Sequence, residues 1–312
     1  MPMRRIDRLP TDHADVIHDV AYDYYGERMA TCSSDMSIKV WERGQCVGSW
    51  KAHDGSVWRL AWAHPEFGQV LASCSFDRAV HVWEDPPGGA RGGTWPRRAV
   101  LQEARDSVTD IAFAPRHLGL RLGALSTDGK LRVYEALDVM NLSTWSLVHE
   151  LEVPRATAFA WGQHSAAPAS LAVGFGDGRT AVKAYDESLR QWRDMAMLEE
   201  HRDSVHSVSW AQHVGRTSQF IATGGRDGVV RVHSLRMPTG PGTTAAGSWE
   251  AIGIARLSDH SQPVWKVDWN PTGTLLASSG DDGTVKVWQA DATGQWQCIS
   301  TVQSDGATME FA

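Results

Sequence analysis

Histidine, serine and aspartate recur together in this sequence, and these three residue types are the components of a hydrolytic triad. Each occurrence also carries a tryptophan. The two complete sets are His53, Ser73, Asp77 and Trp83, and His260, Ser278, Asp282 and Trp288. If one of these sets were catalytic, its serine would be the nucleophile and its histidine the general base.

The repetition of the set argues against catalysis. An enzyme needs its nucleophile once, whereas this set occurs twice, and threonine stands in the serine position of two further copies, at Thr31 and Thr223. The same residue types can form a buried hydrogen-bond network in which Asp bonds to His, His to Ser, and Ser to the indole N–H. We therefore predict structural tetrads, no catalytic residue and no enzymatic activity.

The aspartates mark a repeat that runs through the whole chain. Similar turn sequences recur at intervals of about 40 to 55 residues. Their aspartates are Asp35, Asp77, Asp128, Asp177, Asp227 and Asp282. Upstream, each copy has two apolar residues three positions apart and an aromatic residue two positions further on, as in Val57, Leu60 and Trp62. Each copy is typical of a propeller blade with four short strands.

The repeat predicts an all-β fold, a single six-bladed β-propeller that spans residues 1–312. One four-stranded blade cannot bury both of its faces alone, so the blades must stack in a ring. The predicted blades are residues 13–50, 53–100, 105–151, 155–198, 201–257 and 260–304. Residues 1–12 resemble the segments that precede the other units, and we predict that they form an extra N-terminal strand.

Composition excludes several classes of protein. The net charge is −7 and no basic block occurs, so a nucleic-acid surface is not expected. The apolar runs are far shorter than a membrane span, and the N-terminus lacks the apolar core of a secretory signal. The four cysteines form no CxxC pair, and we expect reduced thiols in a cytosolic or nuclear protein. No metal-ligand spacing or phosphate loop is present, so we predict no cofactor and no metal.

The strand count leaves the N-terminal segment without a blade of its own. Either this segment is redundant, or it belongs to a seventh blade whose other three strands are absent. In the second case the ring is open between blades six and one, and its unpaired strand edges invite insertion of another chain by β-addition. The candidate residues at this insertion edge are Ile6, Leu9, Ile17, Val20, Val264 and Val267. A separate group, Trp58, His206 and Trp265, consists of candidates for packing near the central channel or for contacts on the ring face.

Two levels of resemblance follow from these residues. The units resemble WD repeats, with "VHVWED" and "VKVW" at the motif's end and His53, His201 and His260 at its opening histidine. The segments "WAHPEFGQVLASCSFDR" and "VWKVDWNPTGTLLASSGDDGTVKVW" resemble the Sec-thirteen/Seh-one family of propellers. The segment "LDVMNLSTWSLVHEL" is similar to the Seh-one type of nucleoporin rather than to its coat-protein sister.

This resemblance implies a function. Members are open six-bladed propellers that a helical scaffold partner completes with an inserted blade. For the Seh-one type this partner is the Nup-eighty-five nucleoporin of the Y-shaped outer-ring complex at the nuclear pore. The resemblance also implies support of protein and mRNA transport, and a second role in a vacuolar or lysosomal complex that regulates TOR signalling. The alternatives are a COPII outer-coat propeller in vesicle budding and a closed adaptor that binds peptides on its ring face.

Overall fold

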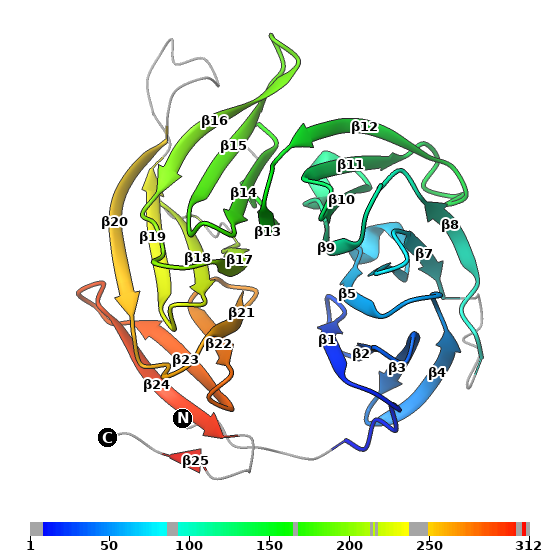
Figure 1. The fold of residues 1–312 in the computed structure, drawn as a ribbon, viewed down its shortest axis with the longest axis horizontal. Helices are drawn as coiled ribbons and strands as arrows, with labels where there is room; N and C mark the ends of the chain where they lie inside the picture. Colours follow the sequence, from blue (N-terminus) through cyan, green and yellow to red (C-terminus); the bar gives the residue numbers. More distant parts are fainter. Residues whose placement is uncertain are drawn as a thin grey trace. The chain divides into compact units, whose positions relative to one another are not determined.

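The fold is that of a computed structural model, which describes residues 9–85, 93–164, 168–212, 215, 218–236 and 249–303, and the backbone of residues 308–309. Across these residues the structure contains six sheets, each built on four strands that are consecutive in the chain, and the last sheet has a short fifth strand (Figure 1). Two short 3-10 helices, η1 (Pro65–Phe67) and η2 (Arg116–Leu118), occur between strands. No helix in the described part of the chain is long and apolar enough to cross a membrane. The sheets confirm the predicted all-β, six-bladed propeller.

Blades one to three form one compact unit, Arg8–Pro154, called here the N-terminal unit. Its innermost strands contact one another in sequence, β1 with β5 and β5 with β9. The strands are β1 (Ile17–Tyr22), β2 (Arg28–Ser33), β3 (Ser37–Glu42), β4 (Gln45–Lys51), β5 (Val57–Trp62), β6 (Val70–Ser75), β7 (Val80–Glu84), β8 (Arg97–Leu101), β9 (Val108–Phe113), β10 (Arg121–Ser126), β11 (Lys130–Ala136) and β12 (Trp145–Glu152).

Blades four to six belong to the second compact unit, called here the C-terminal unit. Strand β13 contacts β17, and β17 contacts β21. The strands are β13 (Ala156–Trp161), β14 (Ser170–Phe175), β15 (Thr180–Asp186), β16 (Gln191–Leu198), β17 (Val205–Trp210), β18 (Gln219–Gly225), β19 (Val230–Arg236), β20 (Glu250–Leu257), β21 (Val264–Trp269), β22 (Leu275–Gly280), β23 (Thr284–Ala290) and β24 (Trp296–Gln303). A short fifth strand, β25 (Thr308–Met309), pairs with β24.

The turn between the second and third strands shows why each repeat carries an aspartate. Its carboxylate accepts the backbone N–H two residues later, for example Ala79 N to Asp77 Oδ1 at 3.0 Å. The residue after the aspartate has positive φ in every blade. Four blades use glycine there, whereas blades one and two place Met36 (φ 67°) and Arg78 (φ 71°) in this left-handed conformation. The aspartate therefore fixes a tight hairpin even without glycine.

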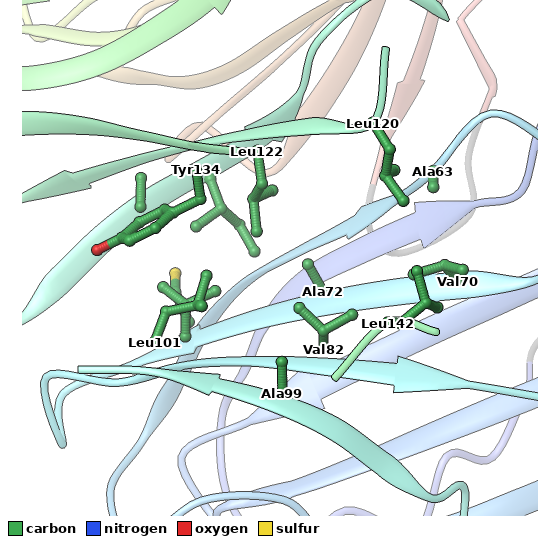
Figure 2. Close-up of a cluster of buried hydrophobic side chains, with 14 of the residues drawn as sticks. Ala63, Val70, Ala72, Val82, Ala99, Leu101, Leu120, Leu122, Tyr134 and Leu142 are labelled. Carbon is green, nitrogen blue, oxygen red and sulfur yellow. The ribbon is translucent and has the colours of Figure 1, made fainter. Parts of the chain in front are cut away.

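The core lies between neighbouring blades. Figure 2 shows the cluster between blades two and three, where Val82 and Ala99 of blade two lie near Leu120 and Leu122 of blade three. Leu142, from the loop between β11 and β12, is buried in the same cluster. Each blade thus buries its apolar face against the next one, which is the reason that a single repeat would not fold alone.

Candidate functional site

The four side chains of the tetrad in blade two form a continuous chain of hydrogen bonds. His53 Nδ1 lies 2.9 Å from Asp77 Oδ2, and His53 Nε2 lies 2.8 Å from Ser73 Oγ. Trp83 Nε1 donates to the same hydroxyl oxygen over 2.9 Å. The carboxylate can only accept, so His53 donates from Nδ1, and its Nε2 accepts the hydroxyl proton of Ser73. The four side chains of this tetrad join β6 and β7 to the loop that enters the blade.

Blades one and six contain the same arrangement. In blade six, His260 lies 2.8 Å from both Asp282 Oδ2 and Ser278 Oγ, and Trp288 donates to the Ser278 hydroxyl. The tetrad of blade one consists of His13, Thr31, Asp35 and Trp41. Sequence reasoning missed the role of His13 because it treated residues 1–12, directly before it, as an extra strand rather than as the segment that enters blade one. The signal was present, since "PTDH" aligns with "WKAH" and "LEEH" before the other tetrads.

The tetrad of blade five is modified. His201 bonds Asp227 at 2.9 Å and Thr223 at 2.8 Å, as in the other blades. The tryptophan position is taken by His233, whose buried Nε2 has no hydrogen-bond partner in the described structure. Arg231 lies beside the network, donates to Asp227 over 3.0 Å and contacts His201 Nδ1. The indole bond is therefore missing here, and an arginine supplies an additional contact to the aspartate.

Blade three replaces the histidine by an arginine. Arg132 is buried and donates to Ser126 Oγ and to Asp128 Oδ2, each over 2.8 Å. In blade four Asp177 is partly exposed and pairs with Arg179 on the surface. Sequence reasoning did not find the role of Arg132, because an arginine four residues after the turn aspartate has the position of an ordinary third-strand residue.

The aspartates of the tetrads are held in their charged form. Burial by itself would raise the pKa of Asp282, but hydrogen bonds from Thr284 and His260 outweigh burial and lower the pKa to about 2. Burial by itself would also raise the pKa of Asp77. The bonds from His53 and two backbone N–H groups outweigh this effect and hold the pKa well below its usual value. Each carboxylate is thus a permanent acceptor at neutral pH.

The hydroxyl groups of these sets lie in the buried interior of their blades. The Ser73 side chain is fully buried, and its hydroxyl oxygen already accepts the indole N–H of Trp83, so a substrate has no access to it. The equivalent Ser278 is buried in the same way. Within the described residues no group of three or more His, Cys, Asp or Glu side chains could hold a metal ion. The hydrogen bonds of each tetrad connect the turn, the entering loop and the third strand of its blade.

The innermost strand of every blade contains a β-bulge. In blade two, Val57 pairs with Ser75 and Arg59 with Cys74, so the residue between them is extra. This explains why the two apolar positions are three residues apart, although a regular strand repeats every two. The extra residues are His18, Trp58, Thr109, Thr157, His206 and Trp265.

The three candidates for the channel or ring face all occupy this bulge. Trp58 is partly buried against the cluster of blades two and three, and its ring centroid lies 4.4 Å from that of His18. His206 and Trp265 are stacked, with ring centroids 4.3 Å apart and planes at 11°. Trp58 therefore belongs to the packed interior of the N-terminal unit, whereas half of the Trp265 surface is exposed.

The predicted edge residues divide into two groups. Ile17 and Val20 in β1 are exposed, but their counterparts Val264 and Val267 in β21 are buried. A Cβ atom placed on Gly224 would lie 2.8 Å from Val264 Cγ1 and 3.0 Å from Val267 Cγ1, so both valines face blade five. This corrects their assignment to an insertion edge, because they form the core between blades five and six.

The expected extra strand is not seen in the described part of the N-terminal segment. Ile6 lies outside the described residues. Residues 9–12 are not in a strand: Asp12 has a positive φ of 51°, and the Lys39 ammonium donates to the Thr11 and Asp12 carbonyl oxygens over 2.8 Å each. Leu9 is close to the turn at Gly44 between β3 and β4. The lysine bonds hold this segment against blade one.

Comparison with known proteins gives the family. The model of the WD domain, G-beta repeat, matches residues 6–42, 44–84, 184–234 and 253–289. The chain is 43% identical to nucleoporin SEH1-A of Xenopus laevis over 320 residues, which cover 96% of this chain and 88% of that protein. It is 44% identical to nucleoporin SEH1 of Danio rerio and 43% identical to that of Homo sapiens, each over 96% of this chain and 87% and 88% of the relative. The chain belongs to the nucleoporin SEH1 family of WD-repeat proteins.

The pattern of matches agrees with the geometry of the blades. The four WD matches in this SEH1-family chain lie over blades one, two, five and six, which are the blades with a histidine bonded to the turn aspartate. Blade three, with Arg132 in place of the histidine, lies between the matched segments. The blades whose third strands the WD model matches are thus the ones that keep the histidine bonded to the turn aspartate.

Proposed function

We propose that the chain is a non-enzymatic scaffold subunit of the outer ring of the nuclear pore. In this proposal it binds a helical-solenoid nucleoporin of the Nup-eighty-five type, which completes the propeller by inserting a blade in trans. The names of the SEH1 relatives support the nucleoporin role. Two apolar blade faces that remain exposed support the insertion.

The first exposed face belongs to blade one. The two apolar positions of the innermost strand are at most 8% exposed in blades two, three, five and six. Those residues are Val57, Leu60, Val108, Ile111, Val205, Val208, Val264 and Val267. In blade one the same positions, Ile17 and Val20, are 37% and 46% exposed. This contrast between equivalent positions is the observation that carries the proposal.

The second exposed face belongs to blade six. In blades one, two and five, which are each followed by another blade of the same unit, the first apolar residue of the third strand is buried; these are Ile38, Val80 and Val230. The equivalent residue of blade six, Val285, is 40% exposed. Covering the part of this side chain that is still exposed would stabilise a complex by about 1 kcal/mol. An inserted blade would supply apolar cover for both faces.

The shape of the proposed complex follows from these faces. A four-stranded blade of the propeller has two apolar faces, and an inserted blade would use both. Such a contact belongs to the obligate class, with roughly 2,000 Å² or more of buried surface. Because its centre is apolar, the complex should resist washing at high salt. Ile6 and Leu9 remain part of the proposal as an N-terminal segment that supports the inserted blade.

Two charge substitutions test the proposal. Val20→Asp and Val285→Asp place a carboxylate in the proposed apolar contact, so each should reduce capture of the solenoid nucleoporin from native extract by at least about tenfold at high salt. Val100→Asp is the matched control, because Val100 is 38% exposed on β8, the outer strand of blade two. Its capture should equal that of the unchanged chain. Full capture by both Val20→Asp and Val285→Asp would reject the proposal.

The proposed cellular roles of the protein depend on the same insertion surface between blades six and one. They are a position at the nuclear envelope, support of protein and mRNA transport, and a second use of the insertion surface in a vacuolar or lysosomal complex that regulates TOR signalling. A version with residues 1–12 deleted, expressed with a fluorescent tag, would show whether the N-terminal segment is needed for a signal at the nuclear rim.

A further inference from the structure

Trp265 is a half-exposed tryptophan in a fixed orientation. It is the extra residue of the bulge in β21, and 50% of its surface is exposed. The His206 ring stacks on one side of the indole at 4.3 Å and 11°. The indole Nε1 donates to Asp281 Oδ1 over 2.6 Å. Two independent contacts thus hold the ring, and its other face is open.

The open face lies on the side away from blade five. His206 belongs to β17 of blade five and covers the indole from that side. In the N-terminal unit, Trp58 occupies the same position in blade two and is packed against the cluster formed with blade three. Trp265 has no following blade in its own unit. Its open face therefore points to the side that the inner strand of an inserted blade would occupy.

The charges around Trp265 favour a cation. Asp281 is exposed, and one of its oxygens bonds to the indole N–H. The nearby cation Arg226 lies 3.8 Å from Asp203, so its charge is already partly neutralised. Burial lowers the pKa of His206, and the imidazole is therefore neutral at physiological pH. An indole face beside a carboxylate is a combination that attracts a positively charged side chain.

We propose that Trp265 and Asp281 form a subsite for an arginine side chain on the inner strand of the partner's inserted blade. The guanidinium would lie over the open indole face and hydrogen bond with the Asp281 carboxylate. Arginine suits this subsite better than lysine, because a planar guanidinium can stack on a ring and bond to a carboxylate at the same time. The source of the arginine rests on the proposed function, but the chemistry of the subsite does not.

The subsite can be tested on the full chain alone. The probe is the blocked tripeptide acetyl-Gly-Arg-Gly-amide, added to protein with ¹⁵N-labelled indole groups and followed by NMR. The Trp265 indole signal is identified by its loss in Trp265→Leu. We expect this signal to shift in a dose-dependent manner with the arginine peptide, and to remain unchanged with the uncharged citrulline analogue. Asp281→Asn should weaken binding about fivefold.

Further variants separate the subsite from unspecific binding. Phe76→Leu is the matched control, since Phe76 is an exposed aromatic residue in the N-terminal unit, and it should leave the arginine titration unchanged. Arg226→Gln removes a neighbouring positive charge and should leave binding equal or tighter. The proposal is overturned if the arginine peptide does not shift the Trp265 signal at millimolar concentration, or if an aspartate peptide shifts it and the arginine peptide does not.

The failure of this inference differs from the failure of the proposed function. If Val20→Asp and Val285→Asp abolish partner capture while the arginine peptide has no effect on Trp265, only the subsite is wrong. If the peptide binds at Trp265 but both variants capture the partner normally, the subsite is present and the inserted blade is wrong.

Discussion

At the scale of residues, the tetrads combine the residue types of a catalytic triad in a buried hydrogen-bond network. The histidine lies between a charged aspartate and a buried hydroxyl group, and the hydroxyl oxygen accepts an indole N–H. In blade two every side-chain N–H and hydroxyl group of the tetrad has a hydrogen-bond partner within the blade, which is the condition for burying such a network at low cost. We expect the network to stabilise the blade, and its contribution should be measurable as a free energy of unfolding.

Asp77→Ala should destabilise the protein by about 2 kcal/mol, because it leaves His53 and two backbone N–H groups without their acceptor. The matched control is Asp177→Ala in blade four, where the aspartate is partly exposed and pairs only with nearby groups of its own turn. That variant should lose less than about 1 kcal/mol. Urea unfolding followed by circular dichroism measures both values, and equal losses would contradict the structural role of the tetrad.

Blade five shows that the tetrad tolerates change in one member at a time. His233 stands where the tryptophan is expected, and burial, followed by the charges of His201 and Arg231, lowers its pKa to about 3. The neutral imidazole fills the position without the indole bond. Arg231 compensates with a contact to Asp227. The residue pattern thus identifies the blade even where one hydrogen bond is absent.

At the scale of elements, the strands and turns could be predicted from the sequence, but the bulge could not. The recurring aspartate, the aromatic residue that follows it and the alternation of apolar residues define each hairpin. The spacing of Val57 and Leu60 was visible as well. Sequence alone does not say which of the two residues between them leaves the ladder, because only the pairing with β6 decides it. The bulge is what turns Trp58 and Trp265 out of the regular strand.

The repeat pattern reveals the tryptophans at the ends of the first and third strands, but it does not reveal those near the fourth strand. Besides those at the ends of the first and third strands, one lies at or just before the fourth strand in blades two to six. These are Trp95, Trp145, Trp192, Trp249 and Trp296. Trp249 packs on Trp210, and Trp296 on Trp269, each within its own blade. The loop before the fourth strand varies in length, so no fixed spacing reveals this position in the sequence.

In blades one and two the third strand is also bonded to the loop that enters the blade. In blade one Lys39 donates to the Thr11 and Asp12 carbonyl oxygens, and in blade two His81 Nδ1 donates to the Ala52 carbonyl oxygen over 2.9 Å. His81 is buried and stacks on His53 with ring centroids 3.9 Å apart. Burial, and then the charge of His53, lowers the pKa of His81 to about 4.

This pKa shift predicts that protonation of His81 on strand β7 destabilises the folded protein. The unfolded chain takes up a proton at His81 near its ordinary pKa of about 6.5. The folded chain does so only near pH 4. The unfolding free energy should therefore fall as the pH falls from about 6.5 to about 4, by up to about 3 kcal/mol from this residue.

His81→Gln keeps a donor for the Ala52 carbonyl oxygen but removes the titrating group. Its unfolding free energy should decrease less between about pH 7 and about pH 4.5 than that of the unchanged chain. His201, His233 and His260 also have lowered pKa values, and both proteins contain them, so the difference between the two proteins isolates His81. Identical pH slopes in urea unfolding would show that His81 does not couple the strand to protonation.

At the scale of the whole molecule, the chain consists of two units of three blades each. The first blade of the N-terminal unit exposes Ile17 and Val20, and the last blade of the C-terminal unit exposes Val285 and Trp265. The residues equivalent to Ile17 and Val20 in blades two, three, five and six are buried, and so are the residues equivalent to Val285 in blades one, two and five. In the proposed function, these exposed apolar side chains are where a partner would supply the neighbouring blade that the repeat pattern expects. The central claim is that one partner supplies it.

Photocrosslinking tests this claim most directly. The crosslinking amino acid p-benzoylphenylalanine replaces Val20 in one variant and Val285 in another, and crosslinked peptides are identified by mass spectrometry after irradiation in native extract. The inserted blade predicts that both positions crosslink to the same short segment of a single helical-solenoid protein. Crosslinks from the two positions to different proteins, or from position 20 to blade six of the same chain, would contradict it.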